Sequence, residues 1–273
     1  MSSARDLLAA LLLILAMLLG ALWLPGVWLD RHVVDRAGFL AITQPLAEDA
    51  ETQKELSDAA VESILDDDRI PNWVAQRATP LLQDQAPRLT GTEVYGELWG
   101  RTMAELHSAL FTAGEQRLEV DLLPVIDALL TGVEGAIPWE IPRPGQASVT
   151  LATIPDIPLL LQVQSLAPWA HWAGPLAGLL ALLAVVLAAH RRSMLALAGV
   201  AGILAGALTC LLAGQIAVLV PDAVDRADFL GPIVGTFEAH FTAAVMPQGV
   251  IMLGVGALVA ATGLVLIGVH RPR

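Results

Sequence analysis

The sequence predicts an α-helical integral membrane protein, with four transmembrane helices and a mainly α extracytoplasmic domain that could include a small two-stranded β element. The chain has 273 residues, of which 55% are hydrophobic, and its mean hydropathy is +0.64. The apolar residues are concentrated in uncharged blocks, one at the N-terminus and three close together near the C-terminus. A chain this apolar belongs to the membrane class rather than to the soluble globular class.

The first block, Leu7 to Leu29, contains 23 residues without a charge. At about 1.5 Å per helical residue, it can cross a hydrocarbon layer of roughly 30 Å. The other uncharged blocks are residues 172–189, 193–220 and 241–269. The predicted segments are a cytoplasmic N-terminus 1–6, transmembrane helix 7–29, extracytoplasmic domain 30–168, transmembrane helix 169–189, cytoplasmic turn 190–193, transmembrane helix 194–220, outer loop 221–243, transmembrane helix 244–269 and cytoplasmic C-terminus 270–273.

A cleaved signal peptide is the alternative to the first transmembrane helix, because signal peptides are also N-terminal and apolar. Their apolar stretch usually has about 7 to 15 residues and ends at a cleavage site of small residues. The block here is longer, and its end, Trp23-Leu24-Pro25-Gly26-Val27-Trp28, lacks that pattern. We therefore expect an uncleaved anchor.

Arginine placement predicts the orientation of the chain, because basic residues near the ends of spans favour the cytoplasm. If all four blocks cross the membrane, one side holds Arg5, Arg191, Arg192, Arg271 and Arg273. That side carries a net charge of +4 and the opposite side a net charge of −16. We expect both termini in the cytoplasm and residues 30–168 outside, where the acidity disfavours nucleic acid as a partner.

The single cysteine, Cys210, lies in the third predicted span, so the external domain can contain no disulfide. A domain of about 139 residues is long enough to bury a hydrophobic core without one. Two of its predicted helices cover residues 50–65, with Asp49 as N-cap, and residues 71–89, with Pro71 in the first turn.

The strongest helical pattern in the external domain covers residues 92–113. Thr92 can cap its N-terminus and Gly114 can end it. Its broad apolar stripe contains Val94, Tyr95, Leu98, Trp99, Met103, Leu106 and Leu110. After this helix, residues 117–120 and 148–153 alternate apolar and polar side chains and could pair as two strands. A short helix at 121–130 and a proline-rich and glycine-rich loop at 132–146 are predicted between them.

The spans themselves contain no Asp, Glu, Lys or Arg at membrane depth, which argues against an ion-coupled transporter. Gly174 with Gly178, and Gly202 with Gly206, place small residues four apart. Such pairs let helices approach closely, so we assign them to helix packing within the chain, with homo-oligomerisation as the alternative. Trp169 and Trp172 are expected to anchor the second span at the membrane interface.

Candidate functional residues in this sequence form no recognised catalytic or metal motif. His107 near Glu105, and Glu238 near His240, lack the spacing of a zinc-binding helix. The run at residues 66–68 lacks the alternating ligands of a calcium loop. We expect no catalytic residue, metal or cofactor, and keep Arg101, His107, Glu238 and His240 as weak functional candidates.

The order of several short motifs resembles a group of uncharacterised actinobacterial integral membrane proteins with one N-terminal span, a large external helical domain and three C-terminal spans. The motifs are residues 34–39, residues 43–47, Trp99-x-Arg101 followed by His107, residues 120–124, and residues 191–195. Similar proteins often carry an Asn-Arg pair where this chain has Met103-Ala104, which weakens any polar role for that helix face. The resemblance implies the topology and a bacterial envelope location, and it brings no established activity.

The function predicted from the sequence is that of a non-enzymatic envelope protein in the cell membrane. Its external domain would bind or organise a protein partner, and its spans would anchor it in the lipid bilayer. Transport or extraction of a lipid or another apolar molecule is the alternative, because uncharged spans would suit that role. An envelope hydrolase is a third hypothesis, which requires two or more of His107, Glu105, Glu238, His240 and the acidic run at residues 66–68 to converge in one cleft.

Overall fold

The computed structural model describes residues 2–49, 92–121, 123–134, 148–154, 156–219 and 230–269. The helices predicted at 50–65 and 71–89, and the acidic run at 66–68, lie outside the described residues. The chain divides into two compact units. Unit 1 contains Met1–Asp35, Gln162–Pro221 and Phe237–Arg273, and unit 2 contains Arg36–Leu161 and Asp222–Thr236.

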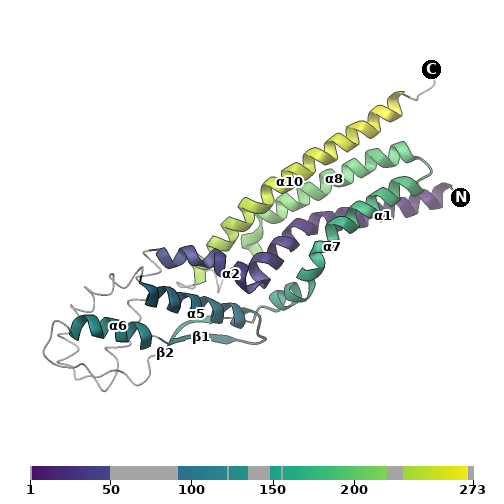
Figure 1. Cartoon of the computed structure of the whole chain (residues 1–273). Helices are drawn as coiled ribbons and strands as arrows, with labels where there is room; N and C mark the ends of the chain where they lie inside the picture. Colours follow the sequence, from purple (N-terminus) through teal and green to yellow (C-terminus); the bar gives the residue numbers. More distant parts are fainter. Residues whose placement is uncertain are drawn as a thin grey trace. The chain divides into compact units, whose positions relative to one another are not determined.

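Four long helices supply most of unit 1 (Figure 1). They are α1 (Ser2–Leu29), α7 (Pro158–Leu187), α8 (Arg191–Gly214) and α10 (Leu230–Val269). Each is long and apolar enough to cross a membrane. The chain is therefore a multi-pass α-helical membrane protein, and this part of the sequence prediction is confirmed.

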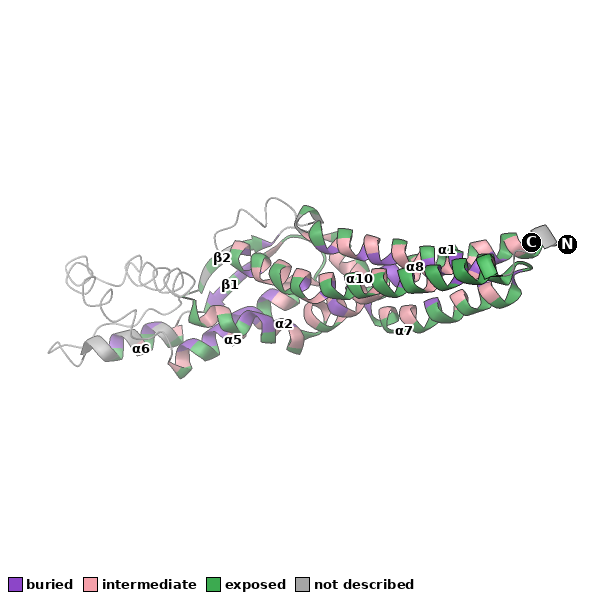
Figure 2. Cartoon of the chain, turned by 90° about the horizontal axis from the view of Figure 1, so that it is seen from above, coloured by how far each residue is buried: buried purple, intermediate pink, exposed green. Residues whose placement is uncertain are grey.

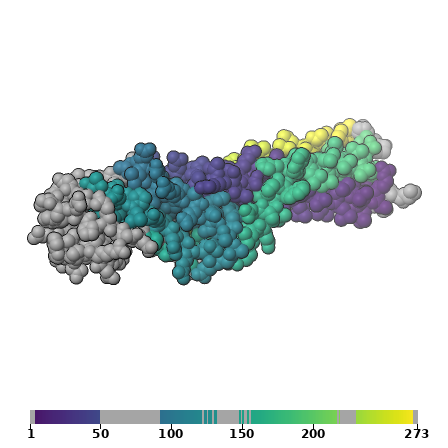
Figure 3. Space-filling model, turned by 60° about the horizontal axis from the view of Figure 1, so that its bottom comes forward, coloured from purple at the N-terminus to yellow at the C-terminus, as the bar shows by residue number. Residues whose placement is uncertain are grey.

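The outward-facing side chains of these four helices are apolar, like the side chains that pack between the helices. Between 17% and 28% of the most apolar window of each helix is buried, so most of each window faces outward. Figure 2 shows this as long exposed and partly exposed stretches on the four helices. In Figure 3 the green surface of α7 and α8 lies between the purple α1 and the yellow α10. Apolar surface of this extent is compatible with lipid rather than with water.

Two of the helices extend beyond the predicted spans. α7 begins at Pro158 and α10 at Leu230, well before residues 169 and 244. A helix satisfies its backbone hydrogen bonds internally, so it need not end where the apolar run ends. With 40 residues, α10 is about 60 Å long, twice a hydrocarbon layer of roughly 30 Å. α8 is shorter than predicted: it ends at Gly214, and the 3₁₀ turn η3 (Ile216–Leu219) follows.

Short polar contacts fasten the turn between α7 and α8 to the start of α1. Asp6 accepts hydrogen bonds from the backbone N–H of Ala189 at 2.8 Å and from Nδ1 of His190 at 3.1 Å. Arg5 donates from Nε to the carbonyl oxygen of Leu187 at 3.1 Å. These bonds satisfy backbone groups that helix ends leave without a partner inside the helix.

Unit 2 is built around α5 (Glu93–Leu110), which packs against α2 (Arg36–Thr43), β1 (Gln116–Asp121) and α6 (Leu123–Glu134). As predicted, the Thr92 hydroxyl caps α5 by accepting a hydrogen bond from the backbone N–H of Tyr95. β1 pairs antiparallel with β2 (Ser148–Ile154), so the predicted two-stranded element is confirmed. α6 continues to Glu134, past the predicted start of the loop at 132.

The apolar stripe predicted on residues 92–113 supplies the core of unit 2. Side chains that are no more than 3% exposed come from α2, α5, both strands and α6, and they include Phe39, Trp99, Met103, Leu106, Leu118, Ile126 and Ile154. Gly114 follows α5 with a φ of 87°, a left-handed conformation that favours glycine and lets the chain turn toward β1. The described part of unit 2 therefore has its own core, held without a disulfide.

Candidate functional site

The candidate site of unit 2 lies between α5 and the end of α2. α2 ends at Thr43, and the 3₁₀ turn η2 (Gln44–Glu48) continues the chain. Pro45 lies in the first turn of η2, where its ring and its missing N–H prevent α2 from continuing. η2 therefore leaves the direction of α2 and forms one wall of a groove, while α5 forms the other.

A buried hydrogen bond joins the two walls. Trp99 Nε1 donates to the backbone carbonyl oxygen of Thr43 at 3.0 Å. This oxygen belongs to the last turn of α2, where helix carbonyls lack partners inside the helix. The Thr43 hydroxyl lies 3.2 Å from the carbonyl oxygens of both Phe39 and Leu40, and Thr43 is fully buried. The hydroxyl therefore bonds within α2, and the Thr43 carbonyl oxygen joins the end of α2 to α5.

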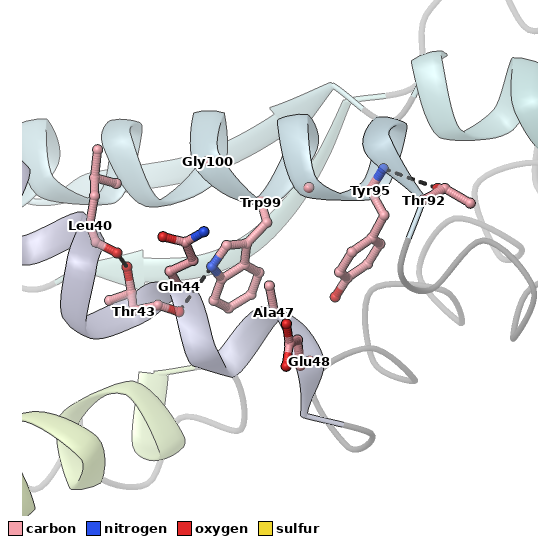
Figure 4. Close-up of a pocket in the computed structure, with 10 residues that line it drawn as sticks. Leu40, Thr43, Gln44, Ala47, Glu48, Thr92, Tyr95, Trp99 and Gly100 are labelled. Carbon is pink, nitrogen blue, oxygen red and sulfur yellow. Dashed lines mark hydrogen bonds between the residues drawn. The ribbon is translucent and has the colours of Figure 1, made fainter.

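The groove itself has a volume of about 410 Å³, within the range of small-molecule sites. Figure 4 shows side chains from α2 and η2 facing those of α5 across it. Its lining consists of Leu40, Thr43, Gln44, Ala47, Glu48, Thr92, Tyr95, Gly96, Trp99 and Gly100. Among the described residues of this lining, Glu48 is the one that carries a formal charge.

Two glycines form the α5 side of the groove. Gly96 and Gly100 lie one helical turn apart, so both point to the same side of α5. A Cβ atom built at either position would meet no other atom within 4 Å. The lack of side chains at these two positions therefore leaves open space along the helix backbone, and a larger residue would fill it.

The hydroxyl of Tyr95 is the unusual polar group of this site. Tyr95 is 4% exposed, and its hydroxyl is buried with no hydrogen-bond partner among the described residues. Its side chain points from α5 toward η2 (Figure 4). Burial raises the pKa of this hydroxyl above its ordinary value, and the negative charge of Asp49 raises the pKa further. A buried hydroxyl without a partner costs roughly 1–3 kcal/mol, so this one needs an explanation.

Two of the weak candidates from the sequence lie on α5 but do not line the groove. Arg101 forms an exposed ion pair with Glu97 at 3.5 Å, a type of pair worth little in water. The ring of His107 lies against two phenylalanines, with centroid distances of 5.2 Å to Phe39 and 5.0 Å to Phe111. Its surroundings are those of a histidine that packs between helices.

The four glycines predicted at helix contacts have different surroundings. A Cβ at Gly202 would lie 3.1 Å from Cα of Gly256, and one at Gly206 would lie 2.7 Å from the carbonyl oxygen of Gly249. Both therefore face α10 within the chain. A Cβ at Gly174 would overlap the Trp23 ring of α1, whereas one at Gly178 would meet nothing within 4 Å.

The remaining predicted residues lie on α7 and α10. Trp169 and Trp172 are 71% and 69% exposed, which suits side chains at a membrane surface. Glu238 is half-buried and His240 is exposed on α10. Throughout the described ranges, no three His, Cys, Asp or Glu side chains gather as a metal-binding group.

A second set of polar and aromatic contacts lies in unit 1, where α1 continues into the π-helical turn η1 (Asp30–Val34). Asp30 Oδ2 lies 2.8 Å from Nε2 of His171 on α7. The Trp28 ring stacks on His32 and meets Phe241 of α10 edge-on, with centroid distances of 4.8 and 5.0 Å. These contacts join the end of α1 and η1 to α7 and α10.

Sequence reasoning missed the groove and identified none of its residues as functional. The sequence pattern places Tyr95 and Trp99 in the apolar stripe, and both side chains are buried as that pattern predicts. The pattern does not predict whether the Tyr95 hydroxyl has a hydrogen-bond partner. One available signal was Gly96 with Gly100, four residues apart inside an amphipathic helix, where glycine is unfavourable. Their spacing, directly after the only tyrosine of the chain, could have marked the site.

Comparisons with protein-family models, with curated proteins and with solved structures found no match to this chain.

Proposed function

We propose that this chain is a non-enzymatic binding or accessory protein of the cell envelope, anchored by its four membrane helices. Unit 2 would lie outside the cytoplasm and bind a ligand or partner in the groove between η2 and α5. The observation that carries the proposal is the buried hydroxyl of Tyr95, which lines this groove without a partner among the described residues. An incoming polar group could supply the missing hydrogen bond.

Two further features support a binding role for the groove. Its two walls are fixed by the Trp99–Thr43 hydrogen bond, so the site requires little ordering when it is filled. Its space exists because Gly96 and Gly100 have no side chains, although glycine in a helix interior costs about 1 kcal/mol relative to alanine. A helix under selection for stability alone has no reason to keep both glycines.

The envelope location and the orientation are parts of the same proposal. They are supported by the arginines near the predicted cytoplasmic ends, and by the resemblance to actinobacterial membrane proteins with this order of segments. The strongly acidic composition of the predicted external segment fits a soluble domain that faces water.

Site-specific photocrosslinking in native membranes tests this function. A photoreactive residue at the exposed Gln44 position samples the groove, and the same residue at the exposed Glu119 position on β1 samples another surface of unit 2. We expect a discrete adduct from position 44 that position 119 does not give. No adduct at position 44, or the same adducts from both positions, would contradict the proposal.

A further inference from the structure

The charged groups at the groove favour a positively charged ligand over a negatively charged one. Glu48 supplies a carboxylate, and none of the lining residues within the described part of the chain supplies a positive charge. Asp49 follows directly and is near enough to act on the Tyr95 hydroxyl electrostatically. Although the first turn of α5 presents backbone N–H groups, Glu93 lies in that turn as well. An anion would be repelled by these carboxylates, whereas a cation would be attracted.

The lining includes two groups that can accept hydrogen bonds from a ligand, the Glu48 carboxylate on η2 and the Tyr95 hydroxyl on α5. The Glu48 carboxylate accepts only, and the Tyr95 oxygen can accept as well as donate. Figure 4 shows Glu48 on η2 and the Tyr95 side chain pointing toward η2. An ammonium group offers three N–H donors and no acceptor, so it matches this pair of acceptors. Hydrogen bonds between an ammonium and a carboxylate are among the stronger ones in proteins.

The other described residues of the lining are uncharged and partly apolar. Leu40, Ala47 and the ring of Trp99 contribute apolar surface, and the backbone at Gly96 and Gly100 is open over one helical turn. One helical turn is about 5.4 Å long, the length of a short chain of methylene groups. A ligand with a charged end and a short apolar stem would use both parts of the groove.

We propose that the groove binds a small organic cation, whose ammonium group donates hydrogen bonds to the Glu48 carboxylate and the Tyr95 hydroxyl and whose apolar stem lies over Gly96 and Gly100. The inference rests on the proposed binding function of the groove and names the chemistry of its ligand. It accounts for the carboxylate, the unpaired hydroxyl and the two glycines with a single ligand class.

The test uses the full chain in lipid nanodiscs and 1,5-diaminopentane as the probe, with 1,5-pentanediol as an uncharged control of the same length. Titration calorimetry should show saturable binding of the diamine, and binding of the diol at least about tenfold weaker. Equal affinity for diamine and diol, or no saturable binding of the diamine, would overturn the inference.

Three variants locate the binding. Glu48→Gln should weaken diamine binding by about tenfold or more, while Glu119→Gln, an equal loss of charge on exposed β1, should leave it unchanged. Gly100→Leu should abolish binding by filling the groove. Because Glu48 is exposed, we expect Glu48→Gln to fold like the wild-type protein. Unchanged affinity in Glu48→Gln would overturn the inference.

The outcome also separates this inference from the function on which it rests. If position 44 gives a specific adduct that excess diaminopentane does not displace, and the diamine does not bind, the ligand assignment fails and the binding function stands. If position 44 gives no adduct and the diamine does not bind, both fail.

Discussion

The indole nitrogen of Trp99 donates a hydrogen bond to the backbone carbonyl oxygen of Thr43, 56 residues earlier in the sequence, at 3.0 Å. Both residues are buried, and both line the groove of unit 2. The bond joins the last turn of α2 to the middle of α5, the two elements that face each other across the groove. The position of η2, which carries Glu48, depends on this attachment because η2 directly follows Thr43.

Replacing Trp99 by phenylalanine should destabilise the protein by about 1–3 kcal/mol, since it leaves a buried carbonyl oxygen without this donor. Trp169→Phe is the matched control, because Trp169 is 71% exposed and should change the stability by no more than about 0.5 kcal/mol. Denaturant unfolding of the purified protein measures both. Equal effects of the two substitutions would contradict a structural role for the bond.

Replacing Tyr95 by phenylalanine should have the opposite effect on the unliganded protein. The ring stays in place while the buried hydroxyl without a partner is removed, so the free energy of unfolding should rise by about 1 kcal/mol. The same unfolding experiment checks this. A loss of stability would mean that the hydroxyl contributes to the folded state, and would remove the main observation behind the proposed function.

The Tyr95 hydroxyl should also make stability depend on alkaline pH. Burial, assisted by Asp49, raises its pKa in the folded state above the ordinary value of about 10. The folded state then holds the proton more tightly than the unfolded state. The effect of Tyr95 on the free energy of unfolding is therefore constant below about pH 10. Above that pH the unfolded state loses the proton first, so the free energy of unfolding falls.

A comparison of unfolding free energies at about pH 8 and about pH 11 tests this dependence. The wild-type protein should lose more stability between the two pH values than Tyr95→Phe, whose side chain cannot ionise. Identical losses in the two proteins would show that the hydroxyl of Tyr95 does not titrate differently in the folded state.

The fold of unit 2 was predictable where local chemistry determines it. The Thr92 cap and Gly114 bracket α5, and the alternation in residues 117–120 and 148–153 gives the two strands. The start of α10 at Leu230 was not predictable from apolarity, because the helix continues through residues that lie outside the uncharged block. Local composition determines where a segment is apolar, whereas internal hydrogen bonds allow its helix to extend further.

Two of the glycines predicted at helix contacts, Gly206 and Gly178, should differ in their sensitivity to substitution. Gly206→Ala places a Cβ about 2.7 Å from backbone atoms of α10 and should cost about 1–3 kcal/mol. Gly178→Ala adds the same methyl group where no atom lies within 4 Å, and should be neutral or slightly stabilising. The free energies of unfolding of the two variants can be measured in detergent mixtures and compared with that of the wild-type protein. Equal costs would show that the packing of α8 on α10 differs from the one described.

The orientation can be tested with single cysteines in a Cys210→Ala background. Arg101 of α5 and Ser193 of α8 are both exposed. A membrane-impermeant maleimide should label Arg101→Cys in intact cells and should label Ser193→Cys only after permeabilisation. The reverse pattern would place unit 2 in the cytoplasm and contradict the envelope location.

The groove was less predictable than the fold, for a physical reason. A tyrosine in an apolar stripe has the same sequence pattern whether its hydroxyl has a partner or not. The distinction depends on η2, which is brought to α5 by a hydrogen bond between residues far apart in the sequence. Glu48 likewise appears as an ordinary surface acid until the structure places it in the lining.

The most direct test of the proposed binding function combines the photoreactive residue at position 44 with Gly100→Leu. The leucine side chain would occupy the open space above α5 and leave the surface of β1 unaltered. We predict that the adduct formed from position 44 in native membranes disappears in this variant and persists in Gly114→Asn, a substitution at a turn outside the groove. An adduct that persists unchanged in Gly100→Leu would contradict the claim that the chain binds its partner in this groove.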